Sequence, residues 1–161
     1  MGTSTKYPLW SVATVTAVAD VLAATDDGLS GREIGHLLAQ TGVADADGSN
    51  KRERLARALL IWQARDQASN CVIRFISEAL APVRYTQQPA VFSRRRDDLN
   101  EVLVHIGLRV NDEGKVASGP AASTLDQAAR HANSPVCCRW PRKILPWRDG
   151  LVGRPDRGVP T

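Results

Sequence analysis

The stretch FSRRRDDLNEVLVHIGLRV, residues 92–110, decides the fold because it joins a helix pattern, a stop signal and the start of a strand. With each residue turned 100° about a helix axis, its apolar positions fall within about 40° of one stripe. Those positions are Phe92, Leu99, Leu103 and Ile106. We predict a helix from Pro89 to Ile106, stopped by Gly107, and then a hairpin formed by LRV, NDEG and KVA.

Four earlier segments show the apolar spacing of helices. The first covers residues 9–24, and Asp20 interrupts its apolar character. This pattern is typical of a core helix rather than of a secretory signal or a membrane span. Its apolar stripe consists of Leu9, Val12, Val15, Ala19 and Leu22.

Capping residues mark the next two helices. Ser30 and Glu33 form a capping box, and Gly42 ends that helix. Asn50 and Glu53 repeat the signature ahead of KRERLARALLIWQAR. The stripes expected to face the core are Ile34, Leu37, Leu38 and Thr41 in the first of these helices, and Leu55, Ala58, Leu59 and Trp62 in the second.

A fourth helix is expected over residues 69–80, with Pro82 as its stop. Thr124 and Gln127 give a further capping signature, for a short helix ending near His131. The predicted fold class is therefore mainly α, a compact bundle of about five helices with one small β-hairpin and a short terminal helix.

The composition changes sharply near the carboxyl end. Residues 1–134 carry 15 basic and 15 acidic side chains, whereas residues 135–161 carry six basic and two acidic ones. The same tail holds five of the nine prolines, two of the four tryptophans and two of the three cysteines. We interpret this composition as that of GC-rich coding DNA read out of frame, with a genuine tail as the alternative. The expected division is a leader, 1–8, a helical domain, 9–132, and an irregular basic tail, 133–161.

The three arginines that open the quoted stretch differ in their expected environment. Arg94 falls opposite the apolar stripe, among acidic residues, where a solvated ion pair is expected. Arg95 and Arg96 flank the stripe, so their alkyl stems should cover the core. The alternative is that this partly buried pair forms an anion pocket at the start of the helix, since guanidinium groups are suited to bidentate contact with phosphate.

A second basic cluster consists of Lys51, Arg52, Arg54 and Arg57. Together with the preceding EIGHLLAQTGV it would form a helix-turn-helix for DNA recognition. The connection between the two helices is longer than the three or four residues of that motif, which weakens this alternative.

The sequence indicates no catalytic residue, no metal site and no cofactor. Neither a C-x-x-C pair nor paired histidines are present, and no histidine has a recognisable Ser or Cys partner. A reducing, cytoplasmic setting is the default expectation.

Several segments taken together resemble the amino-terminal region of the Ymh-like family, bacterial proteins of the abortive-infection type. They are GLSGREIGHLLAQTGV, KRERLARAL, VIRFISEALAPVRY, FSRRRDDLNEVLVHIGLRVNDEGKV and STLDQA, which span roughly residues 9–132. The resemblance implies that a HEPN-like domain would follow, whose ribonucleases use an Arg and a His four to six residues apart. The nearest spacing here, Arg32 to His36, is too short and lies in the wrong region, so no ribonuclease residue carries over.

The resemblance implies a non-catalytic accessory or sensor domain of a phage-defence protein, truncated before its effector domain. The expected partner is nucleic acid or a phage-derived cue, contacted through Arg84, Tyr85, Arg95 and Arg96. Homo-oligomer formation stays open, and no membrane contact is expected. The alternatives are a small DNA-binding regulator that uses the basic cluster at residues 51–57, and a truncated gene product without function.

Overall fold

The computed structural model describes residues 6–121 and confirms a mainly helical fold with one small hairpin. The elements in chain order are α1 (Val12–Leu22), α2 (Gly31–Thr41), α3 (Lys51–Asp66), α4 (Asn70–Ala79), α5 (Pro89–Leu103), β1 (Leu108–Val110) and β2 (Val116–Ser118). Two short 3-10 turns, Pro82–Tyr85 and Val104–Ile106, flank α5. The expected helix near Thr124 and the basic tail lie outside the described residues.

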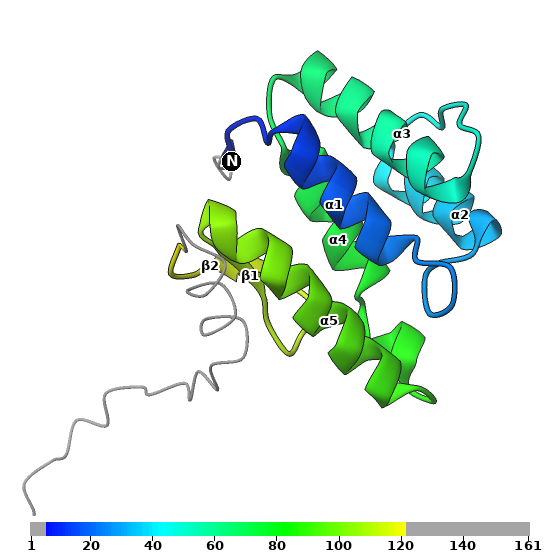
Figure 1. Cartoon of the computed structure of the whole chain (residues 1–161), viewed down its shortest axis with the longest axis vertical. Coiled ribbons are helices and arrows are strands. Elements are labelled where there is room, and N and C mark those ends of the chain that lie inside the picture. The colour runs from blue at the N-terminus through cyan, green and yellow to red at the C-terminus, as the bar shows by residue number, and fades with distance from the viewer. Residues whose placement is uncertain (1–5, 122–161) are drawn as a thin grey trace, which may run out of the picture.

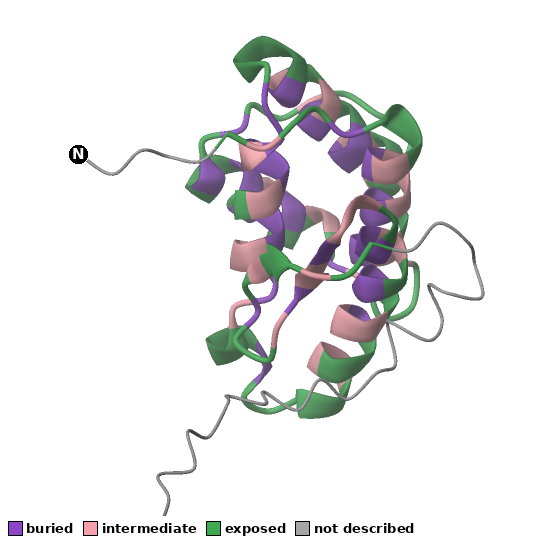
Figure 2. Cartoon of the chain, turned by 90° about the vertical axis from the view of Figure 1, so that its left-hand side faces the viewer, coloured by how far each residue is buried: buried purple, intermediate pink, exposed green. Residues whose placement is uncertain are grey.

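The helices form a bundle around α1. This helix packs against α3 on one side and α5 on the other, while α2 packs against α4 (Figure 1). β1 lies along α5, and β2 contacts α4. Buried residues lie on the inward faces of the helices (Figure 2).

None of the helices within residues 6–121 is long and apolar enough to cross a bilayer. The largest fully buried side chains are Phe75, Leu22, Leu29, Ile34, Leu37, Leu38, Leu55, Leu59, Ile76, Leu80, Leu99 and Leu103.

The predicted capping box at the start of α2 is confirmed. The Ser30 hydroxyl accepts the Glu33 N–H at 3.2 Å, and the Glu33 carboxylate accepts the Ser30 N–H at 2.8 Å. Gly42 ends the helix at φ 75°, in the left-handed region that favours glycine. Local sequence therefore sets both ends of α2.

The cap of α3 is only partly as predicted. The Asn50 side chain accepts the N–H groups of Arg52 and Glu53, at 3.1 and 3.0 Å. The Glu53 carboxylate, however, accepts the N–H and the hydroxyl of Ser49 instead of returning to Asn50. The cap residue is right, and the expected second half of the box is wrong, because Ser49 offers two donors.

Two helices, α1 and α5, are clearly shorter than predicted. α1 begins at Val12, since the Ser11 hydroxyl accepts the Thr14 N–H at 3.1 Å and caps the helix there. Leu9 and Val12, which were expected in the buried stripe, are 48% and 64% exposed. α5 begins at Pro89 as predicted but ends at Leu103 instead of Ile106, because residues 104–106 form a 3-10 turn before Gly107.

A buried polar network fixes the segment ahead of α1. Ser69 opens α4, as predicted, but its hydroxyl accepts the Trp10 N–H at 2.8 Å and donates to the Gln63 side chain at 2.9 Å. The Gln63 amide in turn donates to the Trp10 carbonyl at 2.9 Å. Both side chains are at least nine-tenths buried, so the network satisfies groups that water does not reach.

The side chain of Asn100 on α5 holds the hairpin. Its carbonyl oxygen accepts the Val110 N–H at 2.6 Å, and its amide donates to the Val110 carbonyl at 3.2 Å. Asn100 therefore acts as one more strand residue beside β1. β1 and β2 are antiparallel, with Val110 opposite Val116. Gly114 turns the hairpin at φ 74°, where an added side chain would collide with the Leu80 carbonyl.

Replacing Asn100 with Ala should lower the free energy of unfolding by about 2–3 kcal/mol, because both buried main-chain groups of Val110 lose their partners. Urea unfolding followed by circular dichroism measures this loss. The neighbouring Glu101 is exposed, so Glu101→Ala should stay within about 0.5 kcal/mol. Equal losses for the two variants would contradict the assigned role of Asn100.

Candidate functional site

Three of the four predicted ligand-binding residues meet in one pocket. Arg84 and Tyr85 come from the turn before α5, and Arg95 comes from α5 itself. The loop between α1 and α2 forms the opposite wall. We call this the arginine pocket, and its volume is 230 Å³. The residues that line it are Asp26, Asp27, Gly28, Glu33, Arg84, Tyr85, Gln88, Val91 and Arg95.

Arg95 is the buried centre of this pocket, with only 8% of its surface exposed. One guanidinium nitrogen donates to the Tyr85 hydroxyl at 2.5 Å, and another donates to the main-chain carbonyl of Asp27. The Tyr85 hydroxyl donates onward to the Ala79 carbonyl at 2.8 Å. Arg95 thus links α5, the end of α4 and the α1–α2 loop.

The charge of Arg95 has no direct counter-ion within residues 6–121, since no carboxylate of these residues lies within 4.0 Å of its guanidinium. The nearby acids have other partners. Asp27 pairs with Arg94, and Glu33 pairs with Arg84 at 3.3 Å. A buried cation that is held by neutral oxygens favours the approach of an anion.

The electrostatic field of the pocket acts on Glu33 and Tyr85. The Ser30 N–H is the largest cause that lowers the pKa of Glu33, and the Ser30 hydroxyl, Arg84 and Arg95 lower it further. Burial raises the pKa of Tyr85, although Arg95 opposes that rise. Glu33 therefore carries its charge at neutral pH, while the Tyr85 hydroxyl keeps its proton and can donate.

Arg96 does not belong to this site, contrary to the prediction. Its guanidinium pairs with Asp97 at 2.8 Å and also with Asp112 in the hairpin, and it lies 5.9 Å from the centre of the Phe92 ring. Arg94 forms its ion pair with Asp27, not with the acids of its own helix. Consecutive residues of a helix point in directions that differ by about 100°, so Arg94, Arg95 and Arg96 contact different partners.

The alternative basic cluster is largely used inside the protein. The Lys51 ammonium donates to the carbonyls of Ala24 and Leu29, at 2.7 and 3.2 Å. Arg52 donates to the Ala23 carbonyl at 3.4 Å and the Thr25 hydroxyl at 3.1 Å. These two cations thus hold the carboxyl end of α1 and the loop after it, where helix carbonyls carry partial negative charge.

The remaining two members of that cluster differ. Arg54 pairs with Asp45 and donates to the Gly31 carbonyl at 3.1 Å, whereas Arg57 is exposed. The loop from Gly42 to Asn50 separates α2 from α3. The four side chains therefore do not form one basic face behind a tight turn.

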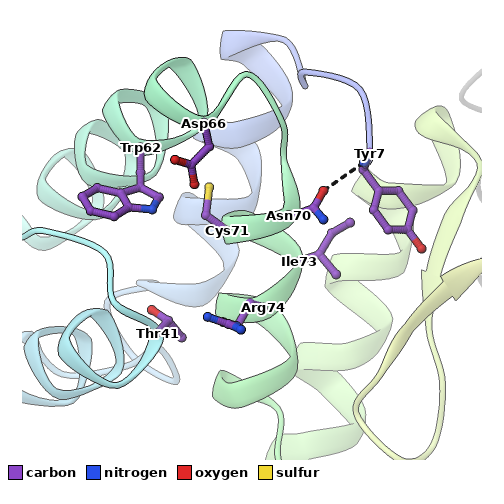
Figure 3. A pocket seen from close by; sticks show the side chains of 8 residues that line it. All are labelled: Tyr7, Thr41, Trp62, Asp66, Asn70, Cys71, Ile73 and Arg74. Atoms are coloured by element: carbon purple, nitrogen blue, oxygen red, sulfur yellow. Dashed lines mark hydrogen bonds between the residues drawn. The ribbon is translucent and has the colours of Figure 1, made fainter. Parts of the chain in front are cut away.

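A second pocket, which the sequence analysis missed, lies between α3, α4 and the end of α2 (Figure 3). Its volume is 350 Å³. Asp66 and Trp62 come from α3, and Arg74 and the buried Cys71 come from α4. Helical spacing places Trp62 and Asp66 on one face of α3, and Cys71 and Arg74 on one face of α4. The sequence does not indicate that these two faces pack against each other.

Two of the three histidines lie in the part of the chain that the structure describes. His36 is exposed, as predicted, and His105 is exposed as well; His131 lies outside the described residues. Within residues 6–121, no group of three or more His, Cys, Asp and Glu side chains is placed to hold a metal ion.

Comparison with known proteins adds no relative. No family model matches the chain, and neither a curated protein nor a solved structure shows significant similarity to it. The resemblance to the Ymh-like family stays a prediction.

Replacing Arg95 with Met, which keeps most of the stem but removes the charge, should cost about 2–3 kcal/mol because the Asp27 carbonyl and the Tyr85 hydroxyl lose a donor. Arg94→Met is the matched control, and its exposed ion pair is worth less than about 1 kcal/mol. Thermal and urea unfolding measure both. A loss for Arg94→Met as large as that for Arg95→Met would contradict the central place of Arg95.

The lowered pKa of Glu33 predicts an acid dependence of stability. Because the folded-state pKa lies below the ordinary value near 4.3, the stabilising contribution is present above that value and is lost as the pH falls through the folded pKa. Glu33→Gln should therefore flatten the decline in unfolding free energy between about pH 5 and pH 3. Urea titrations at several pH values check this slope, and an unchanged slope would contradict the assignment.

Proposed function

We propose that the helical domain is a non-catalytic recognition domain, of the accessory or sensor type, and that the arginine pocket is its contact with an anionic group. The observation that carries this proposal is the buried Arg95 guanidinium, which faces the pocket and pairs with no carboxylate among residues 6–121. An entering anion would supply the missing counter-charge without removing an existing ion pair of Arg95.

The pocket also offers further donors for an anion. Arg84 stands at the rim with its side chain 29% exposed, and the Gln88 side chain lines the same space. Planar guanidinium groups are suited to bidentate contact with phosphate or carboxylate. A volume of 230 Å³ fits a single phosphate-sized group better than a whole nucleotide.

The contact between Arg84 and Glu33 supplies a route from the site to α2. One Glu33 oxygen accepts from Arg84 at 3.3 Å, and the other accepts from the Ser30 cap at 2.8 Å. An anion bound by Arg84 would compete with the first of these contacts and leave the second in place. Binding of the anion would therefore change the contacts of Glu33 at the start of α2. A sensor needs such a link between its ligand site and another part of the fold.

The cue is proposed to be a phosphate group, either free or belonging to nucleic acid. The DNA-regulator alternative through residues 51–57 receives less support, because Lys51, Arg52 and Arg54 are engaged within the fold. A role in abortive infection, with an effector domain supplied elsewhere, rests on the family resemblance alone and is part of the same proposal.

Nuclear magnetic resonance titration of the full chain with inorganic phosphate tests the site. Saturable shifts are expected at the amides of Arg84, Tyr85 and Gln88, and Arg84→Gln should weaken binding at least about tenfold. Arg96→Gln is the matched control, because this arginine lies outside the pocket and should leave the affinity unchanged.

A titration with a short single-stranded oligonucleotide separates the two sources of phosphate. Tighter binding at the same residues with a steep salt dependence would indicate nucleic acid, whereas binding of inorganic phosphate alone would indicate a small anion. Absence of saturable shifts in both titrations, or equal effects of Arg84→Gln and Arg96→Gln, would overturn the proposed contact.

A further inference from the structure

The pocket between α3 and α4 carries two opposite charges that do not meet (Figure 3). Asp66 is the last residue of α3, and Arg74 projects from α4 on the side of α2. Both side chains are exposed, and neither forms a hydrogen bond or an ion pair with any residue between 6 and 121. Opposite charges that line one pocket without contacting each other leave a gap that a ligand with both charges would bridge.

Several arginines of the same domain do have a carboxylate partner. Arg54, Arg84, Arg94 and Arg96 each form an ion pair with an Asp or Glu. Arg65, one residue before Asp66, lies with its guanidinium 4.5 Å from the centre of the Trp62 ring rather than on a carboxylate. Asp66 and Arg74 are the two charged side chains that line this pocket, and neither has a carboxylate or cationic partner within 4.0 Å among residues 6–121.

The space between the two charges is bounded by neutral groups. Trp62 is half-buried and presents its indole along one wall (Figure 3). Cys71 is 7% exposed and lies between Asp66 and Arg74. Burial, and to a smaller extent Asp66, raises the pKa of the Cys71 thiol, which stays neutral. Thr41 also lines the pocket, but its hydroxyl donates to the Leu37 carbonyl at 2.8 Å and is therefore not a donor for a ligand.

We infer that this pocket binds a small zwitterion with an apolar body, of the amino-acid class. The ligand's ammonium group would lie at Asp66 and its carboxylate at Arg74, where a guanidinium suits a planar two-oxygen partner. Its apolar part would pack on Trp62, in the way that aromatic side chains commonly line small-molecule sites. The volume of 350 Å³ is near the lower end of the range of about 300–1,000 Å³ for such sites.

This inference goes beyond the proposed function, because it concerns other helices and a ligand of different charge. None of Trp62, Asp66, Cys71 and Arg74 lines the arginine pocket. Phosphate binding could fail while the zwitterion binds, and the reverse, so the two proposals are tested separately.

The first experiment is a titration of the full chain with L-phenylalanine, L-leucine and L-methionine, followed by amide and indole resonances. At least one of the three should saturate at millimolar concentration and shift the Trp62 indole N–H together with the amides of Cys71 and Arg74. Phenethylamine lacks the carboxylate and 3-phenylpropanoate lacks the ammonium group, so each should bind at least about tenfold more weakly than L-phenylalanine if that amino acid is bound.

The second experiment removes each charge from the protein. Asp66→Asn and Arg74→Gln should each weaken binding at least about tenfold, and because both side chains are exposed and unpaired among the described residues, the melting temperature should not change. Arg32→Gln and Glu101→Gln are controls at exposed charges elsewhere and should bind as the wild type does.

Three results would overturn the inference. They are absence of saturation with all three amino acids, equal binding of L-phenylalanine and its two analogues, and wild-type affinity in both pocket variants. Each would show that Asp66 and Arg74 are ordinary solvated charges. The analogue series needs no substitution, so its outcome does not depend on how a variant folds.

Discussion

Burial of the Arg95 guanidinium is the constraint on which much of the structure depends. Taking this charge out of water is costly unless every donor finds an oxygen, and here the Tyr85 hydroxyl and the Asp27 carbonyl provide two acceptors. These contacts fix the turn before α5 and the α1–α2 loop relative to each other. The same loop then delivers Ser30 to the start of α2, where Glu33 completes the cap.

Cations hold that loop from two sides. Lys51 and Arg52 at the start of α3 donate to carbonyls at the end of α1, while Arg94 and Arg95 on α5 contact Asp27. Helix ends expose carbonyls that have no partner within the helix, and these side chains supply the missing donors. Runs of basic residues that read as nucleic-acid contacts in the sequence are thus mainly internal clamps, in agreement with the electrical neutrality of residues 1–134.

The sequence predicted those features whose cause is local. Ser30 and Glu33 are three residues apart, Gly42 and Gly107 adopt a left-handed conformation, and helical spacing identified Leu99 and Leu103 as buried. The same rule failed for Leu9, which precedes the start of α1 at Val12, and for Val12, which lies in the first turn of α1 and is exposed.

The remaining features depend on contacts between distant segments. Asn100 is polar and falls on no expected stripe, yet it is buried because β1 returns beside it. The sequence predicted similar environments for Arg95 and Arg96. Their partners differ, because Arg95 contacts Tyr85 and Arg96 pairs with Asp112. Asp66 and Arg74 share a pocket only because α3 and α4 pack together. These contacts join residues of different elements, so the spacing of residues along the sequence does not predict them.

Resonances of the arginine side chains test the central claim most directly. In the full chain at neutral pH, the guanidinium protons of Arg95 should give separate, slowly exchanging signals, because two acceptors hold the group and little water reaches it. The exposed Arg94 should give averaged, rapidly exchanging signals and serves as the internal reference. Averaged signals from Arg95 would contradict the account, since they would place its guanidinium in solvent instead of at the junction of α4, α5 and the α1–α2 loop.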